Sequence, residues 1–141
     1  MIYTKNTRKA MNIAYNAHNG QMDKSGVPYI FHPIHLAEQM DTEEECIVAL
    51  LHDVVEDTDI TFENLEKEFP IEVIQCLKLL THDKSVDYIE YVKKIKDNSI
   101  ARKVKLADLK HNSDRTRLIS TTERDEERYK KYKKAIEILN Q

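Results

Sequence analysis

Four ionisable side chains fall within six residues at the end of one apolar run. The run reads Ala49-Leu50-Leu51-His52-Asp53-Val54-Val55-Glu56-Asp57-Thr58. Glu56 follows His52 by four residues. Asp57 follows Asp53 by the same interval, so each candidate ligand has a carboxylate one helical turn beyond it. Because four such groups would be costly to bury without a cation, the pattern predicts a metal site at the His-Asp pair, with the later carboxylates beside a water molecule.

The adjacent His52 and Asp53 point about 100° apart on a helix, so they can share one ion only where the helix faces a cleft. Two further candidates could complete the site. Asp108 lies on a helix with an apolar face, one turn before Asn112, and is either a paired core aspartate or a ligand. His32 precedes Pro33 and either binds metal or caps a helix. Two histidines and two aspartates would form a mixed nitrogen and oxygen site compatible with Mn²⁺, Fe²⁺ or Zn²⁺.

The loop at residues 21–29 is a candidate for ligand contact, because it contains one of the three prolines and, at Gly26, a glycine beside a Lys-Ser pair. Four basic residues could receive phosphate oxygens. They are Lys24, Lys103, Lys105 and Arg128.

Other histidines carry weaker signals. His35 and His111 are expected to be structural or exposed. His82 and Asp83 form a second His-Asp pair, but no carboxylate follows one turn later, so we do not expect a metal there.

Composition predicts an all-α fold. Of the 141 residues, 40% are hydrophobic and 33% are charged, with only two glycines and three prolines, which favours helices over sheet. The length suits one domain, residues 1–141, of about eight helices. The expected helices span residues 4–18, 33–40, 42–57, 62–68, 71–80, 85–96, 99–119 and 122–141.

Charge and cysteine content exclude several classes of protein. With a net charge of −3, the chain lacks the basic character of a protein that binds duplex nucleic acid. Cys46 and Cys76 lie in apolar helical patterns and are expected to be reduced core residues. With no signal sequence and no run of about 20 apolar residues, the chain is expected to be cytoplasmic, without membrane contact. The pattern leaves the oligomeric state open.

Three motifs follow one another along the chain: Ala17-His18-x-Gly20-Gln21-x-x-Lys24-Ser25-Gly26-x-Pro28-Tyr29-Ile30-x-His32-Pro33, the run from Ala49 to Thr58, and Lys105-Leu106-Ala107-Asp108-x-x-His111-Asn112. In this order they closely resemble the hydrolase domain of the RelA/SpoT family, which belongs to the HD superfamily. The resemblance covers about residues 5 to 140. Because the chain ends where that domain ends, it resembles a stand-alone small alarmone hydrolase.

The resemblance implies a manganese-dependent 3′-pyrophosphohydrolase of the stringent response, which converts the alarmones ppGpp and pppGpp to GDP or GTP and pyrophosphate. It implies metal ligands, catalytic residues and substrate contacts. The implied ligands are His32, His52, Asp53 and Asp108; the catalytic residues are Glu56, Asp57 and Asn112; the substrate contacts are Lys24, Ser25, Asn112, Arg128 and Tyr132.

Two departures from the family pattern concern recognition of the base. Asp23 stands where family members commonly carry a basic residue, and Asn112-Ser113-Asp114-Arg115-Thr116 replaces the usual Asn-Met-Arg-Thr. A carboxylate cannot make a cation–π contact with a base. Two alternatives therefore stay open: an HD-type phosphohydrolase of another nucleotide, and a non-catalytic nucleotide-binding module.

Overall fold

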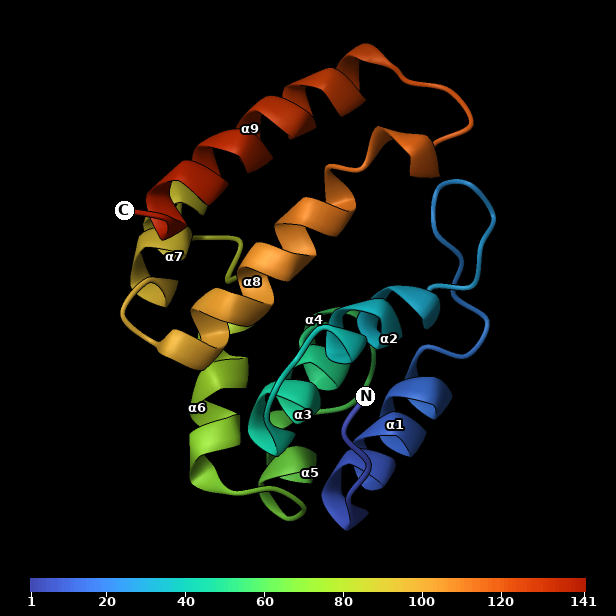
Figure 1. Ribbon diagram of the computed structural model, residues 1–141, viewed down its shortest axis with the longest axis vertical. Coiled ribbons are helices and arrows are strands. Elements are labelled where there is room, and N and C mark those ends of the chain that lie inside the picture. Colours follow the sequence, from blue (N-terminus) through green and yellow to red (C-terminus); the bar gives the residue numbers. More distant parts are fainter.

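Helix α3 (Glu43–Leu51) is the buried centre of the structure, a computed structural model that describes all 141 residues (Figure 1). Thr42 caps this helix by accepting a hydrogen bond from the Glu45 N–H. Every residue from Cys46 to Leu51 is buried, which explains why the run is apolar on all sides. The neighbours of α3 are α1 (Lys5–Ala17), α2 (Phe31–Glu38), α6 (Ile71–Leu80) and α8 (Ser99–Asn112).

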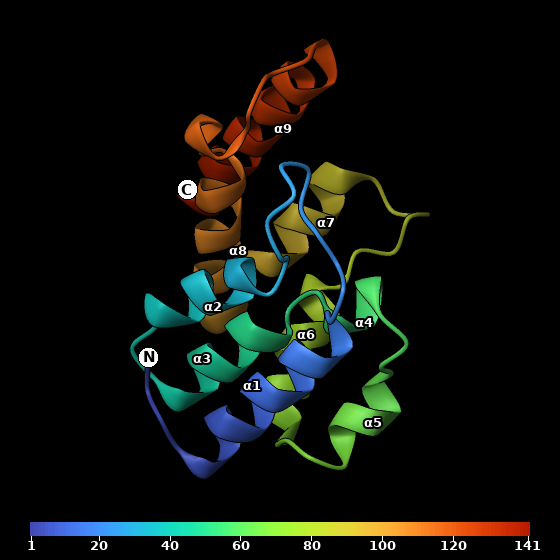
Figure 2. The same ribbon diagram turned by 90° about the vertical axis from the view of Figure 1, so that its right-hand side faces the viewer.

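A second layer is formed by α9 (Glu123–Leu139), which packs on α7 (Tyr88–Ile95) and α8. Ala135 and Leu139 anchor its C-terminal half in the core. In Figures 1 and 2 the loop between α1 and α2 extends toward the segment that joins α8 to α9. The remaining elements are α4 (Val54–Asp57), α5 (Phe62–Glu66) and the 3-10 helix η1 (Arg115–Arg117).

The expected all-helical class is confirmed, since the only β-type pairing is an isolated bridge between Met22 and Pro28. Nine α-helices occur where eight were expected, because the third expected helix breaks at the His-Asp pair. Asp53 adopts φ −107° and ψ 2°. The Ala49 carbonyl would pair with the Asp53 N–H in a continuous helix, but it accepts from His52 Nδ1 at 2.7 Å. The break therefore takes Asp53 out of helical geometry, whereas His52 keeps helical backbone angles.

Two helix boundaries differ from expectation by several residues. The helix expected to reach residue 119 ends at Asn112, because the Asp114 side chain accepts hydrogen bonds from the Thr116 N–H and hydroxyl and turns the chain into η1. The helix expected from residue 85 begins at Tyr88, capped by Asp87. Such short polar side chains compete locally with helix formation.

Cys46 and Cys76 are free and buried, as expected. None of the helices combines the length and the apolar character required to cross a membrane.

Candidate active site

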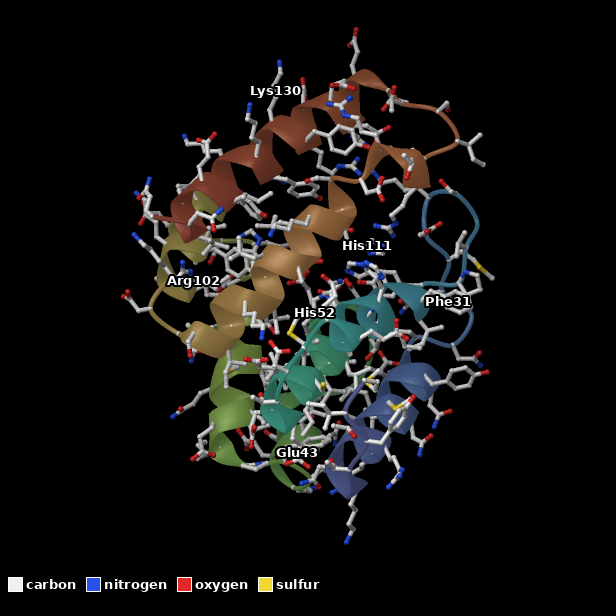
Figure 3. The ribbon with its side chains drawn as sticks, viewed as in Figure 1. Phe31, Glu43, His52, Arg102, His111 and Lys130 are labelled. Atoms are coloured by element: carbon white, nitrogen blue, oxygen red, sulfur yellow. The ribbon has the colours of Figure 1, made fainter.

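His52 lies at the break between α3 and α4 and is 4% exposed (Figure 3). Its Nδ1 donates to the Ala49 carbonyl, which leaves Nε2 directed into the site. Nε2 is buried and makes no hydrogen bond, although it lies 3.0 Å from Asp53 Oδ2 and 3.6 Å from Asp108 Oδ1. A buried ring nitrogen that faces two carboxylates is a position for a cation, either a proton on Nε2 or a metal ion.

His32 occupies the first turn of α2 and faces the same point. Its Nε2 lies 2.8 Å from Asp108 Oδ1. Its Nδ1 lies 2.7 Å from Nδ1 of His111, whose ring is parallel to that of His32, with the centroids 5.0 Å apart. His111 therefore supports His32 from behind, in agreement with the structural role expected for it. Such second partners fix the ring orientation of a metal-binding histidine.

Asp108 projects from α8 into the cluster and is fully enclosed by polar partners. Lys105 Nζ lies 3.0 Å from Oδ2, and the Asn112 amide donates to Oδ1 at 2.9 Å. Although burial opposes ionisation, Lys105 and the two histidines hold the pKa of Asp108 well below its usual range. Asp108 is thus a permanent anion beside both histidines.

Asp53 joins the cluster from the other side of the break. Its carboxylate accepts a hydrogen bond from the Tyr29 hydroxyl, and burial with the Asp53 charge raises the pKa of Tyr29. Candidate ligand atoms of His32, His52 and Asp53 lie within 4.8 Å of one another. Tyr29 was missed as a site residue by sequence reasoning, although its position three residues before His32 pointed to it.

The donor set fits a divalent metal ion. Two imidazoles and two carboxylates are the nitrogen and oxygen ligands that Mn²⁺, Fe²⁺ and Zn²⁺ accept. Burial alone would lower the pKa of His52, yet the charge of Asp53 and a contact with Asp108 raise it well above its usual value. The carboxylates thus attract positive charge to the position where a cation would bind.

Glu56 and Asp57 lie on α4 beside this cluster and line the acid cavity, a hollow of about 280 Å³ bounded also by Lys105, Lys131 and Asn112. Burial, followed by the charges of Asp53 and Glu56, raises the pKa of Asp57 to about 6. Glu56 accepts from the backbone N–H of His82. The backbone of His82 therefore holds the Glu56 carboxylate in place.

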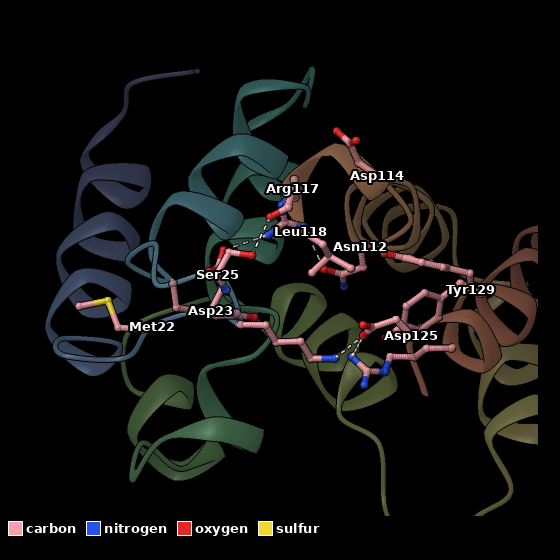
Figure 4. Close-up of a pocket in the computed structure, with 13 residues that line it drawn as sticks. Met22, Asp23, Ser25, Asn112, Asp114, Arg117, Leu118, Asp125 and Tyr129 are labelled. Carbon is pink, nitrogen blue, oxygen red and sulfur yellow. Dashed lines mark hydrogen bonds and ion pairs between the residues drawn. The ribbon is translucent and has the colours of Figure 1, made fainter. Parts of the chain in front are cut away.

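A second hollow of about 310 Å³, the loop cavity, lies between residues 22–29 and α9 (Figure 4). Lys24, Ser25, Arg128 and Tyr132 all line it, so the structure gathers the expected substrate contacts there. Asn112 and Tyr132 line both cavities, which are therefore adjacent. Lys103 lines neither; it pairs with Asp41 and Glu45, which removes it from the candidate phosphate contacts.

Arg117 is a residue of the loop cavity that sequence reasoning placed inside a helix and missed. Its Nη1 donates to the His111 carbonyl at 2.9 Å and to Asn112 Oδ1 at 3.3 Å. Its Nη2 lies 3.7 Å from Asp23, and its own carbonyl accepts from the Ser25 hydroxyl at 2.8 Å. Figure 4 shows Asp23 and Ser25 facing Arg117. The polar run after Asn112 was the available signal for a turn here.

Comparison with known proteins gives concordant results. Residues 10–134 match the HD domain family. The guanosine-3′,5′-bis(diphosphate) 3′-pyrophosphohydrolase MESH1 of Danio rerio is 38% identical over 117 residues, 74% of this chain and 65% of that protein. The bifunctional (p)ppGpp synthase/hydrolase SpoT of Escherichia coli is 36% identical over 124 residues, 77% of this chain and 18% of SpoT. This chain therefore spans less than two thirds of either relative.

A solved structure agrees over the whole fold. It is described as a metazoan orthologue of SpoT that hydrolyses ppGpp and plays a role in starvation responses. The superposition has a TM-score of 0.79 at 28% identity and covers 99% of this chain and 88% of the other.

Proposed function

The chain belongs to the HD domain family, and from this premise we propose that it is a metal-dependent 3′-pyrophosphohydrolase of guanosine alarmones, with residues 1–141 forming the hydrolase domain. It would convert ppGpp and pppGpp to GDP and GTP with release of pyrophosphate. The observation that carries the proposal is the unpaired, buried Nε2 of His52, which faces two carboxylates at the edge of a cavity lined by acids. The homology to MESH1 and SpoT supports the choice of substrate.

Four residues would hold the metal: His32, His52, Asp53 and Asp108. We favour Mn²⁺, with Fe²⁺ and Zn²⁺ compatible with the same ligands. When bound, the ion would supply Lewis-acid activation of the scissile phosphoryl group and lower the pKa of a nearby water.

Glu56 and Asp57 are placed for proton transfer in the acid cavity. A carboxyl group with a pKa of about 6, as at Asp57, can take up and release a proton near neutral pH. We assign to this pair the removal of a proton from the attacking water and its delivery to the leaving group. Glu56 is held toward the cavity by the His82 N–H.

The substrate is expected to lie across both cavities. Lys105 and Lys131 line the acid cavity and supply positive charge for a pyrophosphate group. Tyr29, Tyr129 and Tyr132 give the loop cavity the aromatic surface that a nucleoside requires. Asn112 lines both cavities, so it is placed to contact the ribose that carries the scissile group.

The test is release of pyrophosphate and GDP from ppGpp by the purified protein with Mn²⁺, with an EDTA control and the Asp53→Ala variant. Metal-dependent release that the variant loses is the expected result. Untouched ppGpp in the presence of protein-bound manganese would refute the proposal.

One observation favours a second candidate, the hydrolysis of a different phosphorylated nucleotide. Asp23 lines the loop cavity and brings a carboxylate to the surface that we propose for the nucleoside. A carboxylate accepts hydrogen bonds from amino and imino groups, so it selects bases by a different chemistry from a cation. Turnover of another member of a nucleotide panel, with little turnover of ppGpp, would favour this candidate.

A further inference from the structure

A third hollow, the distal cavity, lies at the start of α9 and has a volume of about 330 Å³. It shares Lys24, Ser25, Asp125 and Arg128 with the loop cavity, so the two adjoin. It shares no residue with the acid cavity. A ligand in the loop cavity could therefore extend one substituent toward the acids and another into the distal cavity.

Positive charge predominates in the distal cavity. Lys24, Arg124 and Arg128 line it, against one carboxylate, Asp125. Asp125 is already engaged: Lys24 lies 3.3 Å and Arg128 3.6 Å from Oδ1, and the N–H and hydroxyl of Thr122 donate to Oδ2. Asp125 thus holds two of the cations in place.

Arg124 is the cation that remains unused. It is exposed, has no ion pair, and lines the distal cavity but neither of the other two. Together with the hydroxyl of Ser120, it makes this hollow suited to a flexible anion with several phosphates.

The next step rests on the proposed function. An alarmone carries one phosphate chain on the 3′ carbon and another on the 5′ carbon, and the acid cavity takes the first. We propose that the distal cavity binds the 5′ phosphate chain, with Lys24 and Arg128 near its inner phosphates and Arg124 at its end. Arg124 is therefore a specificity residue that favours a 5′ triphosphate over a 5′ diphosphate.

The test measures the affinity of the purified full chain for GMP, GDP and GTP by calorimetry, without added metal. These nucleotides carry one, two or three 5′ phosphates and no 3′ group, so binding is read without catalysis. We expect each added phosphate to tighten binding about threefold to tenfold. Arg124→Ala should abolish the gain in affinity from GDP to GTP, and Arg124→Lys should restore part of this gain. Lys130→Ala is the control: it removes the same charge from α9, but Lys130 lines none of the three cavities. This variant should keep both gains in affinity, from GMP to GDP and from GDP to GTP.

Equal affinity for the three nucleotides, or an unchanged step from GDP to GTP in Arg124→Ala, would overturn the inference. Its failure is distinguishable from failure of the proposed function. If ppGpp is hydrolysed but affinity does not rise with each added 5′ phosphate, the distal cavity alone is wrongly assigned. If the steps are present but neither alarmone is hydrolysed, the cavity stands as a 5′ phosphate site and the proposed reaction fails.

Discussion

The two walls of the candidate active site are built in different ways. The metal wall consists of His32, His52 and Asp108, each at most 5% exposed, on helices that pack in the core. The recognition wall consists of the loop at residues 21–29, η1 and the start of α9. It is held by polar contacts between segments far apart in the chain, such as Ser25 with Arg117 and Lys24 with Asp125.

This difference predicts how each wall should respond to amino-acid substitutions. Charges in the metal wall interact in a medium of low polarity, where loss of one partner is costly. Contacts in the recognition wall are partly solvated, and each contributes little. Substitutions in the first wall should therefore abolish chemistry, whereas substitutions in the second should shift affinity and specificity.

The largest effect is expected from Asp108→Asn. This change keeps the size of the side chain but removes the negative charge shared by His32 and His52. Loss of a residue that only supports a metal ligand lowers metal affinity or activity about 10-fold to 100-fold. Loss of a ligand itself should therefore lower manganese affinity and turnover by more than about 100-fold. Elemental analysis and ppGpp hydrolysis measure the two. Asp97→Asn, at an exposed carboxylate that lines none of the three cavities, is the control. Full manganese content in Asp108→Asn would show that Asp108 is not a ligand.

The next largest effect concerns stability. Lys105→Met leaves the buried Asp108 without its cation, so the free energy of unfolding in EDTA should fall by about 3 kcal/mol. Manganese should restore part of this loss by supplying positive charge to the same carboxylate. Urea unfolding with and without Mn²⁺ measures both effects.

Lys103→Met is the matched control for Lys105→Met. Lys103 lies two residues away on the same helix and pairs with Asp41 and Glu45 at the surface. Its loss should cost less than about 1 kcal/mol and should not respond to manganese. Equal losses of stability in the two variants would mean that burial does not set the cost of losing a paired lysine.

The same contrast explains what the sequence predicted. The residue pattern left Asp108 and His32 between a structural and a ligand role, and only the family resemblance added them to the metal site. His52 and Asp53 end an apolar run, so a metal site at this pair was expected. The break at Asp53 was not, because it depends on the His52 ring taking the Ala49 carbonyl. Arg117 was missed because its partners lie up to 94 residues away in the loop, and such long-range pairs leave no periodic signal.

Within the recognition wall, the largest effect is expected at Arg117. This residue holds the oxygen of the Asn112 amide, which turns the amide nitrogen toward Asp108. Arg117→Gln should raise the KM for ppGpp about tenfold, because it removes one charged hydrogen bond. The manganese content should stay at the level of the unaltered protein. Steady-state kinetics and elemental analysis separate the two. Arg8→Gln makes the same change of charge on an exposed part of α1. Loss of manganese in Arg117→Gln would contradict the separation of the walls.

The smallest effect is expected from Gly26→Ala, and a second glycine provides its control. Gly26 and Gly20 adopt φ of +81° and +84°, and an added Cβ would meet no atom within 4 Å at either, so both substitutions carry only the backbone cost. That cost is about 1 kcal/mol. Gly26 lies between Ser25 and Val27, whose N–H groups both bind Asp23. Gly26→Ala should therefore raise KM about threefold, whereas Gly20→Ala should lower stability equally and leave KM unchanged. Equal KM values in the two variants would show that the shape of this loop does not govern substrate affinity, and the recognition wall would then reduce to η1 and α9.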